Sequence, residues 1–158
     1  NMGKPKFKCN EIPLTRDIDP VNINFSIQDL TLKKPFLVNI GNPHIIFFDD
    51  EIEKYDVESF GSLIENDSLF PEKINVSFAK LKSDNHIVLN VWERGAGKTN
   101  ACGTAACATA VAGVEMGVIK NKVTVTLPGG DLEIYYKSSD NIIMTGPTEI
   151  NFTDKYKL

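Results

Sequence analysis

The sequence predicts an α+β fold in which a curved, mostly antiparallel sheet wraps around a central buried helix. Most of the chain consists of short segments in which apolar and polar residues alternate, separated by turn residues, and this pattern is typical of half-buried strands. The segment 103–116 is instead small and apolar on nearly every face. A helix of that composition is surrounded by protein, so we expect the sheet to enclose it.

Eight strands are predicted from the alternation. The clearest one ends at Leu127, and Pro128-Gly129-Gly130 then forms a turn into the next strand. In chain order the predicted strands are Val21–Ile27, Phe36–Ile40, Ile45–Phe48, Asn75–Leu81, Ile87–Trp92, Val123–Leu127, Leu132–Tyr136 and Ile142–Thr145.

Two helices interrupt the strands. The first follows Asp56, a suitable N-cap, and runs to about Glu65, with Gly61 as a weak point. The second runs from about Gly103 to Met116. Since no repeat or linker divides the chain, we expect residues 1–158 to form a single domain with one core.

Composition argues against several classes of protein. The formal net charge of −4 and the scattered basic residues argue against nucleic-acid binding. Three cysteines without a CxxC pair, together with two histidines, argue against a disulfide framework and a metal site. No apolar run reaches the roughly 18 residues of a membrane span, so we expect no membrane partner. A reducing, cytoplasmic location is the simplest expectation. Because the chain opens at Asn1, we also expect a fragment of a longer protein.

The segment 92–104 joins a predicted strand to the N-terminus of the central helix, with Cys102 directly before the helix. The first N–H groups of a helix have no partner within it, and the helix dipole places partial positive charge there. Both effects favour a thiolate, so we expect a lowered pKa for Cys102. The N–H groups of Gly103 and Thr104 could hold a substrate carboxylate. A base beside a carboxylate is the arrangement that removal of an adjacent proton requires.

Two nucleotide-binding motifs fail in this segment. Gly97-Lys98-Thr99 is similar to the end of a P-loop, but Trp92 stands where the first glycine is required. A GxGxxG pattern fails as well, because Asn100 occupies its third glycine position.

A plainer interpretation of the polar candidates stays open. A free cysteine on a helix of small residues is often simple core packing, which is what we expect for Cys107, about 140° around the helix from Cys102. Glu93 and Arg94 end a strand, where a charged pair is often a solvated rim. Asn42 lies in a turn and could merely cap it.

Several motifs nevertheless follow one another in a recognisable order. They are Gly41-Asn42-Pro43-His44, the segment 70–78, the segment 93–104, Leu127-Pro128-Gly129-Gly130 and Met144-Thr145-Gly146-Pro147. This series resembles the carboxy-terminal half of the diaminopimelate epimerase family over nearly the whole chain, and the segment 93–104 is its most specific part.

The resemblance implies a fold of two similar domains, each a sheet around a central helix, facing each other across a cleft. It also implies interconversion of LL- and meso-diaminopimelate without pyridoxal phosphate, metal or any other cofactor. In that reaction one cysteine thiolate removes the α-proton and a second cysteine thiol delivers a proton to the opposite face.

Roles for individual residues follow from the resemblance. Cys102 would be one of the two catalytic cysteines, with Glu93 and His44 contacting the reacting centre or tuning the thiol. The backbone of Gly103 and Thr104 would hold the reacting carboxylate. The distal end of the substrate would be read by Asn42, Asn75 and Arg94.

The chain departs from the family pattern in three respects. Lys98 stands where the family usually has glutamate, and Ala105 where it often has glycine. The second catalytic cysteine belongs to an amino-terminal domain, and nothing in residues 1–101 resembles its segment. We therefore expect this chain to need that missing domain as a partner, to be inactive alone, and to return its last residues to it. A homodimer of the full-length protein is also compatible with the resemblance.

Rival functions stay open at this point. One is another isomerase of the same superfamily, of the proline-racemase or phenazine-synthesis type, although a polar distal site suits proline poorly. The others are a non-catalytic amino-acid-binding module and a globular domain in which Cys102 is only packing.

Overall fold

The computed structural model describes residues 1–21, 23–27, 30–32, 35–150, 152, 153 and 155. Its strands are β1 (Phe25–Ile27), β2 (Leu30–Leu32), β3 (Phe36–Asn39), β4 (Pro43–Phe48), β5 (Asn75–Ser83), β6 (His86–Glu93), β7 (Gly97–Thr99), β8 (Lys122–Leu127), β9 (Gly130–Tyr135) and β10 (Ile143–Thr145). The helices are the short 3₁₀ helix η1 (Ile52–Lys54), α1 (Val57–Glu65) and α2 (Gly103–Glu115).

Eight of these strands form one curved sheet in the order β10-β9-β8-β6-β5-β4-β3, with β7 added beside β6. The pairs β4–β5 and β6–β8 are parallel, and the other neighbours in this sheet are antiparallel. The prediction of a mostly antiparallel curved sheet is therefore confirmed. Its topology is mixed because two crossovers, one through α1 and one through α2, return the chain in the same direction.

The amino-terminal segment links the two edges of this sheet. Lys6 forms a bridge to Asn39 at the β3 edge. At the other end, the Met2 N–H donates to the Ile142 carbonyl at 2.9 Å, and the Ile142 N–H donates to the Gly3 carbonyl at 2.8 Å. The segment therefore spans the gap between β3 and the start of β10, so that the curled sheet is nearly closed around its contents.

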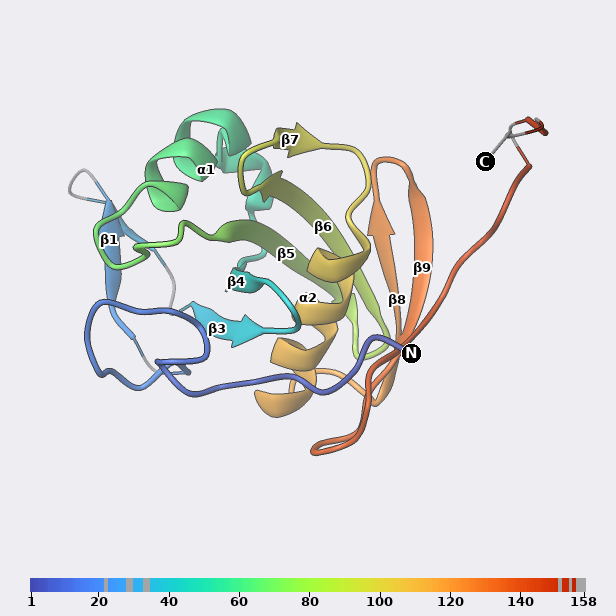
Figure 1. The fold of residues 1–158 in the computed structure, drawn as a ribbon, viewed down its shortest axis with the longest axis horizontal. Coiled ribbons are helices and arrows are strands. Elements are labelled where there is room, and N and C mark those ends of the chain that lie inside the picture. The colour runs from blue at the N-terminus through green and yellow to red at the C-terminus, as the bar shows by residue number, and fades with distance from the viewer. Residues whose placement is uncertain (22, 28–29, 33–34, 151, 154, 156–158) are drawn as a thin grey trace.

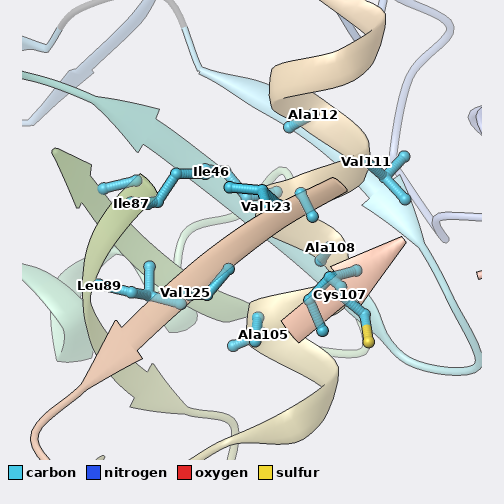
Figure 2. Packing of buried hydrophobic residues seen from close by; sticks show 14 of the residues in the cluster. Ile46, Ile87, Leu89, Ala105, Cys107, Ala108, Val111, Ala112, Val123 and Val125 are labelled. Atoms are coloured by element: carbon cyan, nitrogen blue, oxygen red, sulfur yellow. The ribbon is translucent and has the colours of Figure 1, made fainter. Parts of the chain in front are cut away.

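Helix α2 fills the hollow of the sheet (Figure 1). Its residues from Ala105 to Gly113 are all buried. Figure 2 shows its small side chains packed against Ile46, Ile87, Leu89, Val123 and Val125 from the surrounding strands. Small residues on every face let strands approach on every side, as the sequence predicts.

A second apolar cluster covers the outer face of β3, β4 and β5. It is made by α1, η1 and the β1–β2 hairpin, and Phe47, Phe78 and Tyr55 stack within it. Gly61 of α1 lies directly against Trp92, and a Cβ atom at position 61 would fall 2.5 Å from the Trp92 Cβ. Gly61 is therefore a contact point that lets α1 approach the end of β6.

The predicted elements are confirmed with some changes of boundary. The strand predicted at Val21–Ile27 begins only at Phe25, and Asn22 lies outside the described residues. The short strands β2 and β7 and the helix η1 were not predicted, because each is a single turn or a few residues without a clear alternation. None of the helices in the described ranges has the length and apolar content that crossing a membrane requires.

Candidate functional site

Three polar residues, His44, Asn75 and Glu93, lie side by side on the face of the sheet that covers α2. His44 of β4 pairs with Asn75 of β5. The Asn75 Oδ1 atom accepts from the backbone N–H of Arg94, which directly follows Glu93 at the end of β6. Since strand side chains alternate between faces, His44 shares its face with Ile46, which belongs to the core around α2. This end of the sheet therefore presents a row of polar groups to the N-terminus of α2.

Cys102 is the N-cap residue of α2 and faces this row. Its backbone is extended, with φ −146° and ψ 103°. The Cys102 thiol donates to Glu93 Oε2 at 3.1 Å, and its Sγ lies 3.4 Å from Thr104 Oγ1. Only 6% of Cys102 is exposed in this chain. The predicted proximity of Cys102 and Glu93 is thus present in the structure.

The expected lowering of the pKa of Cys102 is wrong. Burial raises the pKa of the thiol above its ordinary value, and the hydrogen bond to Glu93 and the charge of that carboxylate raise it further. The Thr104 hydroxyl and the Ala105 N–H lower the pKa but do not offset burial. Burial of the sulfur removes water from the thiolate and so disfavours the charged form, an effect that helix position alone does not reveal. In this chain, therefore, Cys102 carries its proton at neutral pH.

His44 is a neutral residue of the site. It is fully buried, and burial, with a contribution from the nearby Arg94 charge, lowers its pKa to about 3. Its Nε2 atom lies 2.9 Å from Asn42 Oδ1. His44 therefore reaches Cys102 only through other side chains, and at working pH it acts as a hydrogen-bonding group.

The predicted distal residues, here called the rim of the site, differ in exposure: Arg94 is exposed, Asn42 is half-buried and Asn75 is buried. The Asn75 Nδ2 group donates to the Pro43 carbonyl at 2.8 Å. The buried Asn75 amide therefore connects the start of β4 to the turn that begins at Arg94. The exposed Arg94 side chain donates from Nη1 to the Glu72 carbonyl at 2.9 Å. Its remaining guanidinium donors are available to a ligand carboxylate.

The N-terminus of α2 is covered on one side by Met144 of β10. A Cβ atom at Gly103 would lie 3.0 Å from the Met144 Sδ, so only glycine fits here without displacing that side chain. The sequence identified Met144-Thr145-Gly146-Pro147 as a motif without a role. Pairing of β10 with β9 places Met144 beside the site.

Comparison with known proteins decides the family. The family model described as diaminopimelate epimerase matches residues 36–151. The chain belongs to the diaminopimelate epimerase family.

Curated diaminopimelate epimerases are similar over almost the whole chain. The chain is 47% identical to the diaminopimelate epimerase of Methylocella silvestris over 156 residues, covering 96% of this chain and 54% of that protein. It is 46% identical to that of Halothermothrix orenii, covering 98% of this chain and 55% of that protein. The chain thus spans about half the length of the curated relatives it matches. Among solved structures, a phenazine biosynthesis protein of the PhzF family from Bacillus anthracis matches 70% of this chain and 35% of its own, with 20% identity and a TM-score of 0.48.

Glu65 is a residue of this epimerase-family chain that sequence reasoning missed. Only 5% exposed at the end of α1, it accepts from the Trp92 indole N–H at 2.7 Å and from the Gly95 N–H at 2.9 Å. Lys73 Nζ lies 3.7 Å from Glu65 Oε1. The Glu65 carboxylate thereby fixes both sides of the turn that carries Glu93. A glutamate at the end of a helix has no distinguishing pattern, so no sequence signal could have found it.

Glu65→Gln is expected to destabilise the fold by about 2 kcal/mol, the range of a hydrogen bond to a buried charged group. Glutamine keeps the volume, but its amide cannot accept from both the Trp92 and Gly95 N–H groups. Urea unfolding measures the effect, with Lys73→Met as the control, because Lys73 contributes only a half-exposed ion pair. Equal stabilities of the two variants would contradict the assignment.

The other two cysteines lie apart from the site. Cys107 is fully buried in the core around α2, and burial raises its pKa to about 12. The Cys9 thiol donates to the Ile18 carbonyl at 2.9 Å. Among the described residues, no group of three or more His, Cys, Asp or Glu side chains could hold a metal ion.

Proposed function

We propose that this chain is the carboxy-terminal domain of a cofactor-independent diaminopimelate epimerase and supplies Cys102 as one of its two acid–base groups. The observation that carries the proposal is the Cys102 thiol, 3.1 Å from Glu93 Oε2 at the N-terminus of α2. The names of the curated relatives, and the half of their length that this chain spans, support it.

The reacting carboxylate of the substrate would bind at the N-terminus of α2. The backbone N–H groups of Gly103 and Thr104 have no partner within the helix, and the helix dipole favours an anion there. When the α C–H bond breaks, negative charge spreads onto this carboxylate, so the same groups would stabilise the carbanion.

Cys102 would act first as the acid. Its thiol is protonated in this chain, so it would deliver its proton to one face of the α-carbon after a thiolate on the opposite face has removed the original proton. The reverse reaction begins with the Cys102 thiolate. Glu93, the acceptor of the thiol hydrogen bond, would orient the proton and contact the substrate amine.

The distal end of the substrate would reach the rim formed by Arg94 with Asn42 and Asn75. Arg94 is exposed and has guanidinium donors to spare, which suits a bidentate contact with a second carboxylate. A substrate without a polar distal group, such as proline, would leave this rim unused.

An amino-terminal domain with the second cysteine would complete the site. The last described residues support a return to that domain. They extend away from the sheet (Figure 1), and Ile150 and Phe152, two residues apart, are 85% and 83% exposed. Alternate exposed apolar residues suit a strand that packs on another surface. A cytoplasmic location and a homodimer of the full-length protein stay predictions.

The test is an assay of the full-length protein with LL-diaminopimelate and, separately, with L-proline, without added pyridoxal phosphate or metal. We expect conversion of the first to the meso form and no racemisation of the second. Racemisation of proline alone would favour the superfamily rival. Binding of diaminopimelate without exchange of its α-proton would favour a non-catalytic binding module.

A further inference from the structure

A continuous chain of hydrogen-bonding side chains runs through the site from β4 to β6. His44 Nε2 lies 2.9 Å from Asn42 Oδ1, and the Asn42 Nδ2 group donates to Thr104 Oγ1 at 3.3 Å. The Thr104 Oγ1 lies 3.4 Å from the Cys102 Sγ, whose thiol faces Glu93 at 3.1 Å. Both polar atoms of the Asn42 amide thus have hydrogen-bond partners within this chain, and any contact with substrate would be additional.

The chemistry of the groups sets the direction of these bonds. The amide oxygen of Asn42 can only accept, so His44 must carry its proton on Nε2. This agrees with a neutral His44, whose Nδ1 has no hydrogen-bond partner among the described residues. The Asn42 N–H in turn occupies a lone pair of the Thr104 oxygen. The hydroxyl proton of Thr104 is then free to point at the Cys102 sulfur.

We propose that Thr104 and Asn42 are positioning residues, with Asn42 holding the Thr104 hydroxyl as a hydrogen-bond donor to the sulfur of Cys102. A hydrogen bond of this kind strengthens when the sulfur becomes a thiolate, because its acceptor is then charged. This hydrogen bond therefore offsets part of the effect of burial, which keeps the thiol protonated. The consequence of the hydrogen bond for catalysis rests on the proposed function, but its effect on the ionisation of the thiol does not.

The titratable groups near Cys102 come from three elements. Glu93 of β6 faces the thiol directly and opposes its ionisation, whereas the fully buried Cys107 lies farther along α2. His44 of β4 directs its Nε2–H at Asn42 and is neutral. None of these titratable groups donates a hydrogen bond to the Cys102 sulfur in the described part of the chain, so the Thr104 hydroxyl is its side-chain donor.

The experiment measures the pH dependence of Cys102 alkylation by iodoacetamide in the 158-residue chain, with the modified cysteine identified by peptide mass. Thr104→Val removes the hydroxyl and keeps the shape. We expect the midpoint to rise by about one pH unit, which is about a tenfold slower reaction at a fixed pH below the midpoint. Thr104→Ser should restore the wild-type midpoint, and Asn42→Ala should give an intermediate one, because the hydroxyl is then free to turn away.

Thr109→Val is the matched control. Thr109 lies on the same helix, but its buried hydroxyl has no hydrogen-bond partner among the described residues and so stands outside the hydrogen-bonded chain. In this variant the pH midpoint of Cys102 alkylation should equal that of the wild type. An unchanged midpoint in Thr104→Val, or no restoration in Thr104→Ser, would overturn the proposal. If Thr104→Val does not fold, Thr104→Ala makes the same comparison. Because no epimerase activity is measured, failure here is distinct from failure of the proposed function.

Discussion

Under the proposed function, replacing Cys102 with serine is expected to lower kcat of the full-length protein by about 10³-fold, within the range for loss of one positioned acid or base. Serine keeps the size of the side chain, but its hydroxyl is a far weaker acid than a thiol. It can accept a hydrogen bond from Thr104 and donate one to Glu93, yet it cannot deliver or remove the α-proton at a useful rate. Steady-state kinetics with LL-diaminopimelate measure the loss.

The matched control is Cys107→Ala on the same helix. Cys107 is buried in the core beside several alanines, and its pKa of about 12 keeps it protonated. The substitution should cost some stability through a small cavity and leave kcat within about threefold of the wild type. A Cys102→Ser enzyme with more than a tenth of the wild-type rate would contradict the assigned role, as would an equal loss in Cys107→Ala.

Gly61→Ala is expected to destabilise the fold by about 2 kcal/mol, a typical cost of overpacking. In an ordinary helix the same change stabilises by about 1 kcal/mol, because alanine has the higher helix propensity. Here the new methyl group would fall 2.5 Å from both the Cβ and the Cγ of Trp92, so α1 must move away from β6. Since Glu65 at the end of α1 holds the turn after Trp92, kcat/KM should fall as well.

Leu63→Ala is the control for this change, because Leu63 lies on the same helix and is 41% exposed. Urea unfolding should place it within about 0.5 kcal/mol of the wild type. An increase in stability for Gly61→Ala would mean that α1 does not approach β6 as closely as described.

The elements that the sequence predicted well are those whose pattern is local. Alternation located most of the strands, and Asp56 was recognised as the N-cap of α1, where its carboxylate accepts from the Glu58 N–H at 3.2 Å. The parallel pairing of β4 with β5 was not predictable in this way, because it depends on the crossover through α1. Strand β7 was missed because its glycine and polar residues are held by pairing with β6 rather than by their own propensity.

The same distinction between local sequence pattern and tertiary contact applies to the site. The motifs identified Cys102 and its neighbours, but the roles of Glu65 and Met144 arise only from tertiary contacts. The pKa of Cys102 was predicted in the wrong direction for a related reason. Helix position is visible in a sequence, whereas burial of the sulfur beside Glu93 is not.

The most direct test of the central claim is incubation of the 158-residue chain alone with LL-diaminopimelate in deuterated water, followed by NMR and chiral analysis. A two-base epimerisation needs an acid–base group on each face of the α-carbon, and we propose that Cys102 serves only one of them. We expect no meso product above background, and activity should return when the chain is joined to an amino-terminal half that carries the second cysteine. Full conversion to the meso form by the chain alone would contradict the account.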